Sequence, residues 1–134
     1  MQSKTRDQIQ AMATAAPVAA MSRREKLERW AALLEAHKGR VQPLRGIEYL
    51  PPERRTGLRG EDSPLALAFS DSVLRTQGLA NDTFGHGTRF FELTAPEAHR
   101  LLCDCHYAGR MTAKELAARL RFTARHPILS KFIY

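Results

Sequence analysis

Residues 101–120, LLCDCHYAGRMTAKELAARL, are the stretch that decides the fold of this chain. Its second half contains a capping box, Thr112-Ala-Lys-Glu115, in which the threonine side chain caps a helix and the glutamate reaches back to it. Gly109 precedes the box and suits the left-handed cap that closes a helix. The stretch therefore predicts two helices joined by a short turn, with two cysteines and a histidine just before that turn.

Two more capping boxes lie toward the N-terminus, at Thr94-Ala-Pro-Glu97 and at Ser22-Arg-Arg-Glu25. Behind the second, apolar residues follow the i, i+3, i+4, i+7 spacing of one helical face, namely Leu27, Trp30, Ala31 and Leu34. Gly39 fits the end of this helix. We expect a helix to begin after each box.

The middle of the chain carries weaker signals. Residues 40–63 are rich in proline and glycine and have no period, so we expect an irregular connection anchored by Ile47, Tyr49 and Leu50. Ser63 followed by Pro64 is typical of a helix start.

That helix should be buried over residues 65–69, be interrupted and capped again over 70–72, and end at Gly78. The composition of residues 81–89, NDTFGHGTR, predicts a flexible loop.

Together these signals predict an all-α fold, a small bundle of four to five helices with no strand. The expected core includes Trp30, Leu34, Leu101, Leu102, Leu116 and Leu120. The 134 residues suit one domain, which we place at 22–134 behind a disordered leader at 1–21. No apolar run is long enough to cross a bilayer, and one C-x-C pair implies no disulfide framework, so we expect a cytoplasmic protein.

The two cysteines are expected to serve packing. If residues 95–106 form one helix, Cys103 and Cys105 lie about 200° apart around it, so their thiols cannot converge on a metal or form a disulfide. Cys105 would then join the core face, and Cys103 would be a surface thiol.

One metal-binding alternative remains open. On such a helix His99, Cys103 and His106 share a flank, and His86 is the obvious donor from outside it. Because no complete pair of zinc half-sites is present, we expect no metal and no cofactor. A catalytic cysteine–histidine pair at the same place lacks an evident oxyanion hole, and the common catalytic motifs are absent, so we expect no enzyme.

Basic residues offer a different hypothesis. The net charge is +7, and no acidic side chain occurs from residue 116 to the end. The candidate binding residues are Lys114, Arg119, Arg121 and Arg125, of which the first, third and fourth form one helical stripe. A stripe without interleaved acids favours an anionic partner.

The segment GRMTAKELAARL resembles the opening of helix-turn-helix and winged DNA-binding domains, whose positioning helix begins with a threonine cap. The resemblance covers about twelve residues and implies DNA binding. The chain departs from the pattern after Leu120, because Pro127 falls where a recognition helix would run.

We therefore expect a small regulatory or adaptor protein that binds an acidic protein or nucleic acid. The alternatives are a DNA-binding regulator and a cysteine–histidine metal or redox site. The apolar C-terminal residues Ile128, Leu129, Phe132, Ile133 and Tyr134 either fold back or dock on another chain, which leaves a homo-oligomer open.

Overall fold

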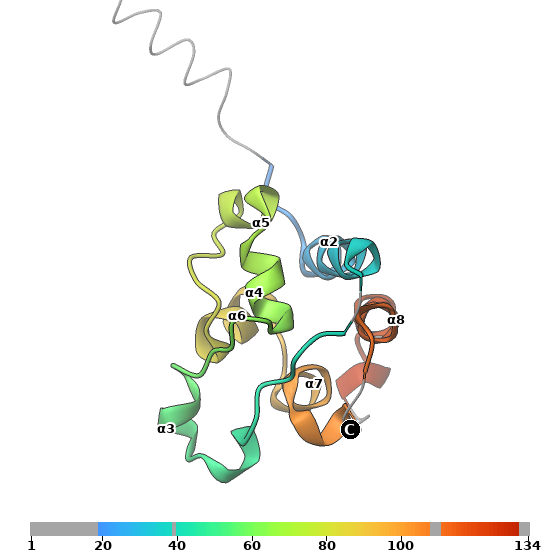
Figure 1. The fold of residues 1–134 in the computed structure, drawn as a ribbon. Coiled ribbons are helices and arrows are strands. Elements are labelled where there is room, and N and C mark those ends of the chain that lie inside the picture. Colours follow the sequence, from blue (N-terminus) through green and yellow to red (C-terminus); the bar gives the residue numbers. More distant parts are fainter. Residues whose placement is uncertain (1–18, 39, 108–110, 132–134) are drawn as a thin grey trace, which may run out of the picture.

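A computed structural model describes residues 19–38, 40–107 and 111–131, which are predominantly helical (Figure 1). The α-helices of this part of the chain are α2 (Arg23–Ala36), α3 (Pro52–Arg55), α4 (Pro64–Phe69), α5 (Ser72–Thr76), α6 (Phe84–Phe90), α7 (Ala95–Leu102) and α8 (Ala113–Arg125). Three short 3-10 helices are η1 (Ile47–Tyr49), η2 (Asp104–His106) and η3 (Leu129–Lys131). The predicted helical class is confirmed, but seven α-helices replace the expected four to five, because short helices form where we expected irregular chain.

Side-chain caps start the helices where the sequence places them. Both halves of the capping box form at Ser22 and at Thr94, and Thr112 accepts the Glu115 backbone N–H. Ser63 caps α4 with proline at its first turn, and Asp71 caps α5, as the predicted interruption required. Gly109 and Gly39 lie outside the described residues.

Helices α2 and α8 pack side by side and are both seen nearly end-on in Figure 1. They run antiparallel, since Glu28 in the middle of α2 reaches Arg125 at the end of α8, while Glu35 reaches Arg121. Their facing surfaces contribute to the core. All six expected core residues are fully buried, namely Trp30, Leu34, Leu101, Leu102, Leu116 and Leu120, and so are Leu27 and Ala31 of the same α2 stripe.

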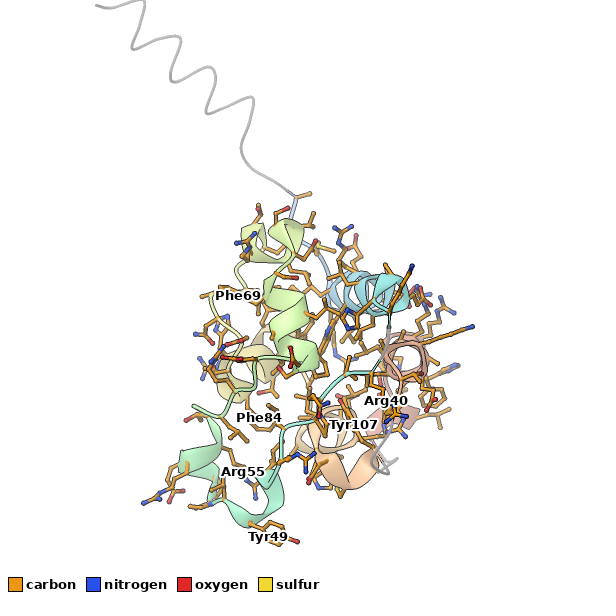
Figure 2. The ribbon with its side chains drawn as sticks, in the orientation of Figure 1. Arg40, Tyr49, Arg55, Phe69, Phe84 and Tyr107 are labelled. Carbon is orange, nitrogen blue, oxygen red and sulfur yellow. The ribbon has the colours of Figure 1, made fainter. Side chains whose placement is uncertain are left out.

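The chain that follows α2 runs through the middle of the molecule and joins its two sides. The backbone N–H of Gln42 donates to the Asp62 carbonyl at 3.1 Å, and that of Leu44 donates to the Leu102 carbonyl at 2.9 Å. Isolated bridge pairings accompany these contacts, Arg40 with Thr112 and Leu44 with Cys103. Ile47 is buried as expected, whereas Tyr49, predicted as an anchor, is exposed (Figure 2).

The prediction of a flexible loop at residues 81–89 is wrong, because α6 occupies most of this segment. Thr83 caps this helix by accepting the His86 backbone N–H. Glycine normally disfavours a helix by about 1 kcal/mol, but here a Cβ on Gly87 would lie 2.5 Å from a Leu65 methyl carbon. A Cβ on Gly85 would lie 2.9 Å from the Thr56 backbone. The glycines therefore allow α6 to approach α4 and α3 closely.

The two ends of the described chain differ. Residues 1–18 of the predicted leader lie outside the described residues, while the Gln77 side chain bonds the backbone of Ala19 and Met21. At the other end Ile128 and Leu129 are exposed, and Ser130 is buried. The remaining apolar tail, Phe132, Ile133 and Tyr134, lies outside the described residues, so its docking stays a prediction.

Candidate functional site

The site begins where α7 ends. In a continuous helix the Leu102 carbonyl would accept the N–H of His106, four residues on. Here it accepts the N–H of Leu44, and Cys103 leaves the helix in an extended conformation with φ −80° and ψ 139°. The chain then turns once as η2. The prediction of one helix over residues 95–106 is therefore wrong for its last turn, because α7 ends at Leu102.

This break brings the two cysteines together. The Sγ atoms of Cys103 and Cys105 lie 3.2 Å apart, although we expected them on opposite sides of one helix. Their burial is also the reverse of the prediction, since Cys103 is fully buried and Cys105 is exposed. The extended residue between α7 and η2 turns a divergent pair into a convergent one.

His99, in the last full turn of α7, completes the cluster. Its Nε2 lies 3.4 Å from the Cys105 Sγ, and one ligand atom each from His99, Cys103 and Cys105 all lie within 4.8 Å of one another. Within the described ranges this is the one group of three or more histidine, cysteine or acidic side chains so arranged. We call these three residues the thiol–imidazole cluster.

Burial sets the protonation of the inner thiol. Loss of hydration raises the pKa of Cys103 to about 12, and the neighbouring Cys105 and Asp104 side chains also contribute to the increase. The Cys103 thiol points to the Asp104 carboxylate, with Sγ and Oδ1 3.6 Å apart. At neutral pH Cys103 is therefore a protonated thiol that must lose its proton before it can ligate a metal.

The spacing fits a tetrahedral metal site. With metal–sulfur bonds of about 2.3 Å and metal–nitrogen bonds of about 2.0 Å, ligand atoms lie about 3.5–3.8 Å apart. The observed sulfur–sulfur and sulfur–nitrogen separations are 3.2 Å and 3.4 Å. The third pair, His99 with Cys103, lies within 4.8 Å, so side-chain shifts of up to about an ångström would admit a zinc-sized ion.

The other predicted histidine donors lie elsewhere or cannot be placed. His86 sits on α6, where its Nε2 accepts the Ala80 backbone N–H at 2.8 Å, so it does not belong to the cluster. The backbone of His106 belongs to η2, while its side chain lies outside what the structure describes. Cys105, which we assigned to the core, is the ligand that sequence reasoning missed.

The predicted basic residues on α8 are largely engaged within the molecule. Arg121 bonds both carboxylate oxygens of Glu35, at 2.9 Å for the Nε contact, and contacts Glu28 at 3.1 Å. Arg125 also contacts Glu28 at 3.1 Å. The Arg121 hydrogen bond, with help from the charge of Lys114, lowers the pKa of Glu35.

Arg119 donates to the Arg100 carbonyl at 3.2 Å. Lys114 and Arg125 are the exposed members of the four, and Arg125 is paired with Glu28. The acids that neutralise this surface come from α2, which is why the composition of α8 alone suggested a free cationic stripe. Anion binding by these four residues stays a prediction.

A pocket of about 540 Å³ lies beside the cluster, between η1, α3, α6 and α7. Its apolar surface comes from residues such as Ile47, Phe84 and Leu93, and His99 forms part of its wall. Arg55 and Arg89 also line it, and Figure 2 labels Arg55 and Phe84 on two of its helices. Thus one histidine belongs both to the pocket and to the thiol–imidazole cluster.

Comparisons with known proteins add no relative: no family model, no curated protein and no solved structure matches the chain. Over the ranges that the structure describes, every helix is too short or too polar to pass through a bilayer. The functional argument therefore depends on the site itself.

Proposed function

We propose that this protein binds one zinc-class divalent ion through His99, Cys103 and Cys105. The observation that carries the proposal is the convergence of the three ligand atoms within 4.8 Å. Thiolate and imidazole ligands together favour a soft or borderline metal over magnesium or calcium, which prefer oxygen.

The position of the ligands in the chain indicates what kind of site this is. All three come from seven consecutive residues, so a bound ion would link α7 to η2 and would not join distant segments. Three protein ligands also leave a tetrahedral ion one further position, as in zinc sites that exchange water for a substrate. We therefore propose a site whose bound ion keeps one position open to an outside ligand. Stabilisation of the whole fold by the ion would be a minor effect.

Metal binding at this site would release protons. The buried Cys103 carries its proton at neutral pH because burial raises its pKa to about 12. The bound ion must replace that proton, so the apparent affinity should rise with pH.

The adaptor hypothesis and its DNA-binding alternative remain predictions. Both depend on basic residues of α8, and Arg121 and Arg125 are paired with acids of α2. The net charge of +7 still suits an anionic partner. The paired basic residues of α8, however, support anion binding less than the converging ligand atoms support metal binding.

The test is a titration of the reduced full chain with Zn²⁺ against a chromophoric chelator, together with Co²⁺ spectroscopy. We expect one ion per chain and the intense near-ultraviolet band that cobalt–thiolate bonds produce. Cys105→Ser and His99→Ala should each weaken binding at least about tenfold, because even the loss of an outer partner of a metal ligand costs about that much.

His86→Ala is the matched control, because it removes a histidine that lies outside the cluster. Binding by this variant should equal that of the parent chain. Absence of a stoichiometric ion, or equal losses in His86→Ala and His99→Ala, would refute the site.

A further inference from the structure

The paired sulfurs support a second chemistry that does not need a metal. The Sγ atoms of Cys103 and Cys105 are 3.2 Å apart, and a disulfide bond would require them to approach to about 2.05 Å. Residues two apart along a chain have Cα atoms at most about 7 Å apart, close to the range that disulfides span. The break at Cys103 already directs both side chains to the same point, so small side-chain rotations supply most of the remaining movement.

We propose that Cys103 and Cys105 form a dithiol–disulfide couple that exchanges with a small anionic disulfide, with Cys105 as the attacking sulfur and Cys103 as the resolving one. In the first step the Cys105 thiolate attacks one sulfur of the small disulfide and releases one small thiolate. In the second step Cys103 gives its proton to the small thiolate released in the first, and the Cys103 thiolate so formed attacks the Cys105 sulfur and releases the other. The protein dithiol is oxidised, the small disulfide is reduced to two thiols, and each protein proton passes to a released thiolate.

Exposure assigns the two roles. Cys105 is exposed, so a substrate in solution can reach its sulfur. Cys103 is fully buried and contacts the Cys105 sulfur, so it can attack only that sulfur, once the sulfur is part of a mixed disulfide. Because thiol–disulfide exchange requires the attacking thiol to reach the disulfide, the accessibility of each sulfur makes Cys105 the attacking thiol and Cys103 the resolving one.

The neighbouring pocket indicates the class of substrate. His99 contacts the Cys105 sulfur at 3.4 Å and also lines the pocket of about 540 Å³. Arg89 in the same lining has no ion-pair partner in the described part of the chain, and the Arg55 Nε donates only to the Leu50 carbonyl at 2.7 Å. Glu92 also lines the pocket, but it lies 3.9 Å from the Lys26 ammonium. The surplus of positive charge favours a disulfide that carries carboxylates.

The couple and the proposed metal site use the same sulfurs, and only this relation rests on the proposed function. A bound ion would occupy both thiolates, so the loaded protein should not exchange. A chain that forms the disulfide would in turn lose two of its three metal ligands. The two states exclude each other because they compete for the same lone pairs.

The first experiment incubates the reduced, metal-free full chain with oxidised glutathione and follows released thiol and protein mass. We expect two thiols released per chain and a protein that is lighter by two hydrogen atoms and carries no adduct. Cys103→Ser should stop at a mixed disulfide on Cys105 and release one thiol. A parent chain that keeps a glutathione adduct, or that links to a second chain, would overturn the proposal.

The second experiment compares oxidised glutathione with cystamine, a disulfide of similar reactivity that carries positive charge. We expect the anionic disulfide to react about tenfold faster at low salt, and less so at high salt. Arg89→Gln should reduce this preference, while Arg54→Gln, on an exposed arginine outside the pocket lining, should keep it. Equal rates in the parent chain would overturn the substrate class.

A zinc-treated sample separates this inference from the proposed function. If one ion binds, exchange should slow until a chelator is added. If the zinc titration fails while metal-free exchange proceeds, the metal proposal falls and the dithiol couple stands. Exchange at an unchanged rate in a chain shown to hold zinc would refute the shared use of the sulfurs.

Discussion

The interface between α2 and α8 and the turn after α7 treat their polar groups in opposite ways. At the interface, arginines of one helix meet glutamates of the other, as in the Arg121 contacts with Glu28 and Glu35. At the turn, two thiols and an imidazole gather: the Cys105 Sγ lies 3.2 Å from the Cys103 Sγ and 3.4 Å from the His99 Nε2. Charges at the interface are neutralised by partners within the fold, while the cluster brings together three side chains that can each ligate a metal.

This difference distinguishes a structural framework, the α2–α8 interface with its core, from a candidate chemical site, the thiol–imidazole cluster. Opposite charges that pair lower the energy of the folded chain and need nothing from outside. Three soft metal ligands within 4.8 Å of one another gain little from each other, because thiol hydrogen bonds are weak. The proposed ion would connect all three side chains, and the proposed oxidation would connect the two sulfurs. We expect substitutions in the framework to change stability and those in the cluster to change chemistry.

The largest loss of stability should come from Trp30→Ala. Trp30 is fully buried, stacks on Phe91 with ring centroids 4.1 Å apart, and donates its Nε1–H to the Pro64 carbonyl at 2.9 Å. Removing so large a buried ring should reduce the free energy of unfolding by about 4 kcal/mol. Chemical denaturation measures it, and a loss below that of Glu97→Gln would show that the core of the framework lies elsewhere.

Glu97→Gln should come next and should also change the response to acid. Burial opposes the charge of Glu97, but hydrogen bonds from Ser130, the Thr94 backbone and Arg23 keep the pKa of its carboxyl below the ordinary value. Breaking this ion pair should remove about 2–3 kcal/mol, less than for a fully buried pair because Arg23 keeps some contact with water.

The sign of the pH effect follows from the lowered pKa. The stabilisation is fully present above the unfolded pKa of about 4.3 and is lost as pH falls through the lower folded value. The parent chain should therefore lose stability in acid more steeply than Glu97→Gln. Parallel denaturation curves at pH 3 to 6 check this, and equal slopes would contradict it.

Arg121→Gln tests the paired charges between α2 and α8. Its partner Glu35 is largely exposed, so solvent screens the pair, and the loss should be about 0.5–1 kcal/mol and smaller at high salt. The variant also tests the anion-binding hypothesis. A large fall in DNA affinity together with a steep salt dependence would restore the α8 surface as a binding site.

The smallest change in stability should follow Cys105→Ser. The side chain is exposed, so the free energy of unfolding of the metal-free chain should stay within about 0.5 kcal/mol. Zinc binding should nevertheless weaken at least about tenfold, and disulfide formation should be lost. If this substitution cost as much stability as Trp30→Ala, the cluster would belong to the framework and the comparison would fail.

Helix starts were predictable because they depend on neighbouring residues. Ser22, Thr94 and Thr112 cap the backbone three residues ahead, and such a bond needs no distant partner. The glycines of α6 were misread for the opposite reason. Their value lies in close packing against Leu65 and Thr56, which the local sequence cannot reveal.

The amino-acid sequence by itself determined the helical class, the helix starts and the apolar faces that form the core, since periodicity and capping act over a few residues. Only the tertiary structure decided where α7 ends, because the Leu44 N–H, distant in sequence, takes the Leu102 carbonyl. It also decided that the arginines of α8 meet the glutamates of α2. The cysteines converge for the same reason: a backbone hydrogen bond from far along the chain replaces a local one.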